Sequence, residues 1–475
     1  MKEIKYFSFV AIAILVFICL SSCKHAKTSG GSASSEGEDQ LDGSEVVDGA
    51  VVHLSKLTDD RGNWIDSLWT DGKLVYTKQK YYKENLSICG GCKNLQYLDI
   101  PAYAIIEGDK YRVTSVIAEA FINHPSLKEI SIPAYIEHVG RMAFAGTPIV
   151  SASLSCGEIS SSAFYNCSVL NNLYLDEGVE VIASEAFKGC ESLHYLVCPQ
   201  SMQSIGTDAF KYSSLESIDL GGVRELAESA FDGCYFIKEV NLGSNLETIG
   251  PCAFDGCWNI ESITFPESIK FVGHDAFRGC SGLTSVVLPE GFKTLKFGAF
   301  DRCKHLQSVV LPESLDSLEF STFGECIELT SVTLPSHLKK IPQWCFLGCK
   351  SLEEIEIPTG VTVIEEGAFT SCGLKSLTLP EGVVRVEKGA FNNCSFTYLK
   401  LPSTIEVIEY TAFLDCTSLT DIYCLAKNVP ETDRAAFHFV KNPLSATLHV
   451  PSSSVEAYRM TEPWDDFKTI VPIDD

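Results

Sequence analysis

The sequence has few basic side chains, and it lacks the short motifs by which many enzymes are recognised. Lysine and arginine number 37 against 62 aspartate and glutamate residues, which gives a net charge of −25. This balance disfavours passive binding to nucleic acid or to anionic lipid. The sequence has no G-x-x-x-x-G-K-[ST] loop, no G-x-S-x-G elbow, no H-E-x-x-H pair and no G-x-G-x-x-G after a predicted strand. It therefore gives no sign of a nucleotide, acyl-transfer or zinc-hydrolase site.

Long hydrophobic runs are also scarce. The apolar run from Tyr6 to Leu20 is 15 residues long, which is short of the ~20 that a membrane-spanning helix needs. Lysines precede the run, and Leu20-Ser21-Ser22-Cys23 follows it, so residues 1–22 are predicted to be a signal peptide. The tetrapeptide resembles the lipobox of bacterial lipoproteins, which implies cleavage before Cys23 and acylation of this residue. The alternative is an ordinary secretory signal with an incidental cysteine.

Residues 23–45 contain almost no apolar side chain and are rich in glycine, serine and acid. Such a segment cannot bury enough surface to fold, so it is predicted to be a flexible tether. A lipid on Cys23, a tether and a folded body together indicate a protein held on a bacterial envelope.

The rest of the chain is dominated by a repeat, A-F-x-x-C. Nine of the fourteen gaps between successive repeat phenylalanines are 23 residues. A period of this length is typical of a solenoid, in which each coil buries its apolar face against the next. The repeat phenylalanines are Phe121, Phe144, Phe164, Phe187, Phe210, Phe231, Phe254, Phe277, Phe300, Phe323, Phe346, Phe369, Phe391, Phe413 and Phe437.

One coil, residues 280–302, illustrates the frame C-x-x-L-x-x-I/V-x-L-P-x-x-L-x-x-I-x-x-x-A-F-x-x. Val286 and Leu288 are two positions apart, so they point to one side of a predicted strand while Val287 points to the other. The proline that follows ends the strand because it has no N–H to donate. Phe300 and the alanine before it suit a tight interior corner. Each coil is therefore expected to add one parallel strand to a sheet on one face.

This unit resembles the leucine-rich repeat of BspA-like, or treponemal-type, bacterial surface proteins, over roughly residues 86–471. The resemblance implies a mostly β, curved right-handed solenoid of 23-residue coils with a parallel sheet on one face and a cap at each end. It also implies an extracellular, non-enzymatic protein of a family in which some members are implicated in adhesion to host matrix proteins or to other bacteria. We expect residues 46–91 to form the N-terminal cap, 92–440 the solenoid, and 441–475 a last strand with the C-terminal cap.

The cysteines, 20 in all, invite a disulfide framework, but the repeat argues against one. Equivalent side chains in adjacent coils point in parallel and stay ~4.8 Å apart, whereas a disulfide needs Cβ atoms at ~3.8 Å. We expect a buried column of reduced thiols that act as small hydrophobic groups. Cys89-Gly-Gly-Cys92 has the spacing of a redox motif, but Cys92 falls on the column position and Cys89 on the phenylalanine position. We interpret the motif as part of a degenerate copy of the repeat.

The outward side of the strands is the expected binding surface. Its middle carries uncharged serine, threonine and valine, and tyrosines gather toward its ends. Tyrosine anchors many interfaces because it offers a large rigid ring and a polar tip, so Tyr174, Tyr195, Tyr398 and Tyr423 are the candidate binding residues. The alternative is that these tyrosines are there because tyrosine favours strands.

The sequence thus predicts a monomeric, non-enzymatic outer-membrane lipoprotein, exposed at the cell surface through the lipid on Cys23. Its partner would be an extracellular protein or glycan, with no nucleic acid, no cofactor, no metal and no catalytic residue. A structural or accessory envelope protein without a host ligand is the first alternative. An enzyme within residues 46–91 is the second, but such a segment is too short for most active sites.

Overall fold

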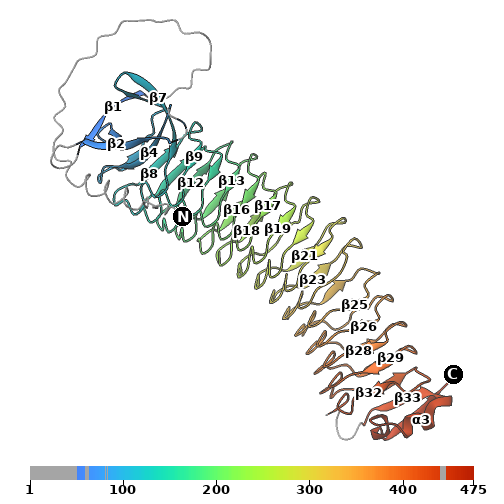
Figure 1. Cartoon of the computed structure of the whole chain (residues 1–475). Helices are drawn as coiled ribbons and strands as arrows, with labels where there is room; N and C mark the ends of the chain where they lie inside the picture. The colour runs from blue at the N-terminus through green and yellow to red at the C-terminus, as the bar shows by residue number, and fades with distance from the viewer. Residues whose placement is uncertain (1–50, 59–63, 81, 83, 439–444, 475) are drawn as a thin grey trace, which may run out of the picture. The chain divides into compact units, whose positions relative to one another are not determined.

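A computed structural model describes residues 51–58, 64–80, 82, 84–438 and 445–474. The predicted signal peptide, Cys23 and the tether lie outside these residues. The chain divides into two compact units, residues 1–213 and 214–475 (Figure 1). In the described part of the chain, no helix has the length and apolar character needed to cross a bilayer.

The first unit begins with antiparallel strands. Strands β1 (Val51–Thr58), β2 (Trp64–Thr70), β3 (Leu74–Lys78) and β4 (Asn85–Gly91) pair in sequence order. Strands β6 (Tyr103–Ile106) and β7 (Asp109–Val116) form a hairpin beside them, with β6 parallel to β1 and β7 parallel to β4. The hairpin turns at Glu107 and Gly108, whose φ angles of 53° and 98° are both positive, as a two-residue type I′ turn requires.

Parallel coils follow in the same unit, shown in teal and green in Figure 1. One face carries β5 (Tyr97–Leu98), β8 (Glu129–Ile132), β10 (Ser151–Leu154) and β12 (Asn172–Leu175), paired in register, followed by β14 (Tyr195–Val197). A second ladder continues from β7 through β9 (His138–Val139), β11 (Glu158–Ile159), β13 (Val181–Ile182) and β15 (Ser204–Ile205). Each coil of this unit thus adds a parallel strand to one face, as predicted, and a second strand lies behind it.

The second unit repeats this plan. Its strand face consists of β16 (Ser217–Asp219) with β18 (Glu239–Asn241), then β21 (Ser285–Val287), β23 (Ser308–Val310) and β24 (Ser331–Thr333), then β27 (Ser376–Thr378), β29 (Tyr398–Leu401), β31 (Asp421–Cys424), β33 (Thr447–Pro451) and β34 (Thr469–Ile473). The second ladder consists of β17 (Glu225–Leu226), β19 (Thr248–Ile249), β20 (Phe271–Val272) and β22 (Thr294–Leu295), then β25 (Lys340–Ile341), β26 (Val363–Ile364), β28 (Arg385–Val386), β30 (Val407–Ile408) and β32 (Glu431–Thr432).

The strand face of this unit is interrupted at two coils. Residues 262–264 and 354–356 form no strand, so the prediction of one strand in every coil is wrong there. In the second of these coils Glu353, Glu354 and Glu356 are all exposed, and glutamate is depleted in strands. Strand pairing also depends on the register between neighbouring coils, and the sequence pattern of a single coil does not specify this register.

The repeat phenylalanines form a buried interior column. In the first unit the rings from Phe121 to Phe210 stack with centroids 5.1 to 5.5 Å apart. In the second unit those from Phe231 to Phe437 stack at 5.2 to 6.0 Å. Backbone bonds hold the same register, as where Phe277 N–H donates to Ala299 O at 2.9 Å. The predicted interior corner is therefore confirmed.

The corner also has a backbone feature that the sequence frame did not include. Residues two before and two after the phenylalanine repeatedly have positive φ, for example Cys252 at 52° and Asp275 at 53° before it, and Gly256 at 73° and Gly279 at 70° after it. Glycine adopts this left-handed conformation without steric cost, which explains why F-x-G-C is a common form of the repeat.

Different groups close the two ends of the column. In the second unit Trp464 and Phe467 lie against Phe437, with ring centroids 5.3 and 5.6 Å away. They belong to a segment made of η2 (Ser452–Ser454), α3 (Val455–Arg459), η3 (Trp464–Asp466) and the residue after η3. In the first unit Gly91 packs against Phe121, since a Cβ at this glycine would lie 3.0 Å from the ring. The first end of the column in the first unit and the last end of the column in the second unit are thereby covered.

Candidate functional site

The first predicted tyrosine pair lies on the outward face of the first unit. Tyr174 is on β12 and Tyr195 begins β14, and their side chains are 58% and 62% exposed. Tyr174 is the third residue of its strand and Tyr195 the first of the next, so they occupy different rows. No ring contact joins them among the residues that the structure describes. The structure therefore places both on the expected surface without bringing the rings together.

The second pair is brought together on the last sheet of the second unit. Tyr398 lies on β29 and Tyr423 on β31, where Lys400 is directly opposite Tyr423. The two tyrosines are thus diagonal neighbours, close enough for aromatic side chains to meet across a sheet. Their ring centroids are 5.3 Å apart and the rings are tilted by 39°.

Two further residues complete this group. His449 on β33 is directly opposite Tyr423, and the two rings stack with centroids 4.1 Å apart and planes within 2°. The Nε2 atom of His449 lies 3.3 Å from Oδ1 of Asp421. We call Tyr398, Asp421, Tyr423 and His449 the terminal aromatic cluster. The sequence analysis did not assign His449 to a site, although the alternation of Leu448 and Val450 as inward residues would have placed it outward.

The cluster combines flat apolar surfaces with hydrogen-bonding groups. Partial burial raises the pKa of Tyr398, with smaller effects from Tyr423 and Asp421. The phenol therefore stays protonated at neutral pH and can donate a hydrogen bond. Aromatic faces beside hydroxyl, imidazole and carboxylate groups suit recognition of an amphipathic partner, such as a sugar ring or an exposed peptide segment.

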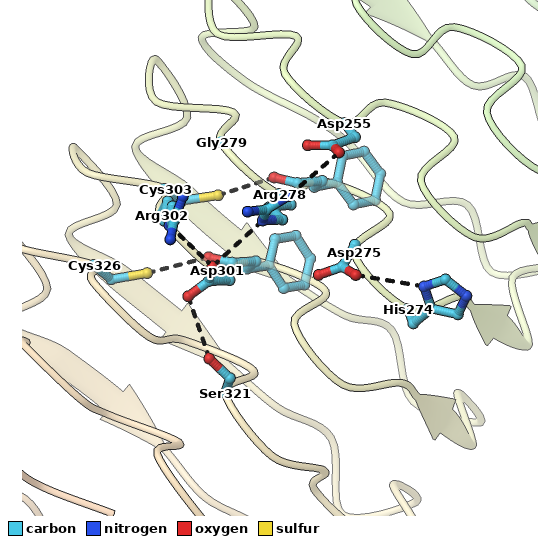
Figure 2. Close-up of polar contacts among 12 residues, drawn as sticks. Asp255, His274, Asp275, Arg278, Gly279, Asp301, Arg302, Cys303, Ser321 and Cys326 are labelled. Atoms are coloured by element: carbon cyan, nitrogen blue, oxygen red, sulfur yellow. Dashed lines mark hydrogen bonds and ion pairs between the residues drawn. The ribbon is translucent and has the colours of Figure 1, made fainter.

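The repeat cysteines serve the interior of the fold. No disulfide joins the described cysteines, and most of those in the repeat are fully buried. Ten of the repeat thiols donate a hydrogen bond to the carbonyl of a repeat phenylalanine in a preceding coil, a contact that was not predicted from the sequence. Figure 2 shows Cys303 and Cys326 in this arrangement, with sulfur to oxygen distances of 3.3 Å to Phe277 and Phe300. Burial raises the pKa of both thiols, so they are poor nucleophiles at neutral pH.

Cys89 does not have the environment of a redox cysteine. It is 4% exposed on β4, in a cluster with Leu57, Leu68 and Val75, and burial raises its pKa to about 12. Reactive C-x-x-C motifs lower the thiol pKa instead. The structure also corrects the assignment of Cys89 to the phenylalanine position, because Cys89 lies within β4, where the register against β3 shifts, and Gly91 is what meets the ring of Phe121. Antiparallel pairing with β3, which sets Leu74 opposite Gly91 and Val75 opposite Gly90, keeps this segment a strand.

Comparison with known proteins identifies the repeat. The sequence model of the BspA type leucine rich repeat region (six copies) matches residues 91–216, 157–284, 272–394 and 345–458. A leucine-rich repeat protein from Bacteroides ovatus has a similar structure, with a TM-score of 0.58 and 23% identity over 80% of this chain and 98% of that one. A leucine rich cell surface protein from Faecalibacterium prausnitzii is 22% identical over 75% of this chain and 94% of that one, with a TM-score of 0.41.

No curated protein matches the sequence significantly. The structural likeness to the Bacteroides ovatus protein supports the leucine-rich-repeat fold. The matches to the repeat model together extend over residues 91–458, which is most of the sequence. The chain therefore belongs to the BspA-type leucine-rich-repeat family.

Proposed function

We propose that the protein is a non-enzymatic, lipid-anchored component of a bacterial envelope that binds an extracellular protein or glycan through its outward strand faces. The terminal aromatic cluster carries this proposal, because it joins Tyr398, Tyr423 and His449 into one partly exposed aromatic surface. The BspA-type repeat family is typically non-catalytic. The name of the Faecalibacterium prausnitzii relative supports a place at the cell surface.

Charge and composition narrow the kind of partner. The net charge of −25 disfavours polyanionic partners such as nucleic acid. Serine, threonine and valine occupy much of the strand face between the tyrosines, as on β21, β23 and β24. A neutral, elongated partner would meet few desolvated charges there, and aromatic anchors would supply most of the binding energy.

The anchor has a direct test. Cells grown with labelled palmitate should incorporate the label into the wild-type protein and not into a Cys23→Ser variant. The Cys23→Ser variant should also leave the membrane fraction, because a lipid chain supplies ~0.8 kcal/mol for each buried CH₂ group. Labelling that is absent from the wild type, or equal in the two proteins, would contradict acylation of Cys23.

Binding is tested with arrayed matrix proteins and glycans. The full chain should retain at least one array member, and a variant with all four tyrosines changed to alanine should lose it. The control is Phe236→Ala, which removes an exposed ring, 53% accessible, that lies outside the four proposed positions. Equal binding by the tyrosine variant would overturn the role of these side chains. The absence of binding by the wild type would favour an accessory role in the envelope.

A further inference from the structure

One edge of the second unit brings together three side chains of the kind that bind transition metals. Cys252, His274 and Asp275 place one potential ligand atom each within 4.8 Å of one another, and in the described part of the chain no other group of three or more metal-ligating side chains is this close. None of the three belongs to the interior column or to the tyrosine surface. The three residues were not predicted as a site because Cys252 is one coil away from the other two, and no short sequence spacing connects them.

The repeat explains why the three residues meet. Cys252 and Asp275 occupy the same position of successive coils, two residues before the phenylalanine, with φ angles of 52° and 53°. His274 precedes Asp275, and its carbonyl accepts a hydrogen bond of 2.9 Å from the Cys252 N–H. The Asp275 N–H donates in the same way to Phe297 O at 3.0 Å. Backbone bonds between coils therefore hold the ligand positions in place before any ion arrives.

The imidazole is fixed in orientation, but its Nδ1 atom forms no hydrogen bond with the described residues. The His274 ring stacks flat on Phe297, with centroids 4.8 Å apart and planes within 2°, and Phe297 stacks in turn on Phe320 at 4.6 Å. The Nδ1 atom of His274 is buried, and among the described residues it has no hydrogen-bond partner. Its nearest charged atom is Oδ2 of Asp275, 3.5 Å away (Figure 2). A buried ring nitrogen without a partner is costly, and an ion beside it would remove this cost.

The carboxylate is also held in place. A Cβ at Gly298, in the following coil, would lie 2.3 Å from Oδ1 of Asp275, so the absence of a side chain there makes room for the carboxylate. The nearby cation Arg278 is engaged elsewhere, with ion pairs of 3.7 Å to Asp255 and 3.6 Å to Asp301 (Figure 2). Glu228, Asp232 and Asp255 add negative charge around Cys252. The local field therefore favours a cation.

We propose that Cys252, His274 and Asp275 bind one zinc-type divalent ion through the Cys252 sulfur, the His274 Nδ1 atom and an Asp275 carboxylate oxygen. Ligands about 2.0–2.3 Å from a tetrahedral zinc ion lie roughly 3.3–3.6 Å from one another. The observed ligand atoms lie within 4.8 Å of one another, so the most distant pair would approach by up to about 1.5 Å on binding. On binding, the Cys252 thiol proton leaves to solvent as the sulfur–metal bond forms. The thiolate and imidazole select zinc over calcium or magnesium, which prefer all-oxygen sites.

Three protein ligands leave the fourth tetrahedral position open. His274 and Asp275 are partly exposed, so water or a donor atom from a partner can occupy this position. The ion would also link two adjacent coils, because Cys252 and Asp275 belong to different ones. The site thereby offers a second means of contact with a partner, independent of the tyrosines.

The test uses the untagged full chain under reducing conditions. Titration with Co²⁺ should give one equivalent of binding with a thiolate-to-cobalt charge-transfer band, and Zn²⁺ should displace the cobalt. Cys252→Ser should abolish the band and weaken zinc affinity at least tenfold. Serine already occupies the equivalent position with positive φ at Ser229, so this variant should fold. Asp275→Asn should weaken zinc affinity while keeping the charge-transfer band.

His305→Gln is the matched control. His305 belongs to the same unit and lies 2.9 Å from Glu328, but among the described residues these two are not part of a group of three metal-ligating side chains. This variant should keep both the band and the affinity. A wild type that binds neither Co²⁺ nor Zn²⁺ would overturn the site. Cobalt binding without the charge-transfer band, or affinity unchanged by Cys252→Ser, would overturn it as well.

Discussion

The interior corner of the coil and its outward strand face obey opposite rules. In the corner, nearly the same residues return in every coil, and each packs on its own counterpart, as Phe277 does on Phe300 at 5.3 Å. On the outward face the equivalent positions vary, and residues of different kinds meet, as Tyr423 and His449 do. Repetition in this chain therefore serves stacking in the interior, whereas chemical variety lies at positions outside the phenylalanine column, on the outward face and at the edge that carries Cys252 and His274.

The largest effect expected from this contrast concerns the phenylalanine column. Phe277→Ala removes a fully buried ring that stacks on both sides, so it should lower the free energy of unfolding by about 3–5 kcal/mol. Phe236→Ala in the same unit removes an exposed ring and should change it by less than about 0.5 kcal/mol. Urea denaturation followed by circular dichroism measures both. Similar losses of unfolding free energy in the two variants would contradict the distinction between the interior corner and the exposed surface.

A smaller effect is expected from a single thiol of the buried column, Cys303, at alkaline pH. Burial raises the pKa of Cys303, so the folded state keeps this proton when the unfolded chain begins to lose it above pH ~8.5. The unfolded state then binds fewer protons, and stability falls as pH rises by about 1.4 kcal/mol per pH unit for each such thiol. Denaturation at pH 7 to 10 under reducing conditions should show this fall. In Cys303→Ser the free energy of unfolding should fall less steeply with pH, by about 1.4 kcal/mol per pH unit. The same slope in the variant and the wild type would contradict the raised pKa of Cys303.

The smallest effect on stability is expected at the outward tyrosines of the first unit. Tyr174→Ala and Tyr195→Ala each remove a ring that is more than half exposed. Their free energies of unfolding should stay within about 0.5 kcal/mol of the wild type. A loss of about 2 kcal/mol or more in either variant would indicate that the tyrosine contributes to packing of the fold.

The sequence predicted those parts of the fold that depend on one coil at a time. The spacing of Phe277 and Phe300 fixed the interior column, and the alternation of Val286, Val287 and Leu288 placed the strand and its outward side. These features follow from local side-chain direction and burial, which each coil repeats.

Features that depend on two coils at once were not predictable in this way. The interruptions of the strand face, the thiol donation from Cys303 to Phe277, and the approach of His449 to Asp421 all require the register between neighbours. The convergence of Cys252 with His274 also requires it, together with the left-handed backbone at the corner. Contacts between residues of different coils could therefore be identified from the structure but not from the sequence pattern of one coil.

The central claim is that the outward face binds a partner while the corner supports the fold. Its most direct test is the affinity of Tyr398→Ala/Tyr423→Ala for the array member that the wild-type chain retains, measured beside the urea midpoint of the same variant. We expect the variant to bind this array member at least about tenfold more weakly than the wild type, as for aromatic anchors at interfaces, and to remain folded under the binding conditions. Wild-type affinity in this variant would contradict the claim.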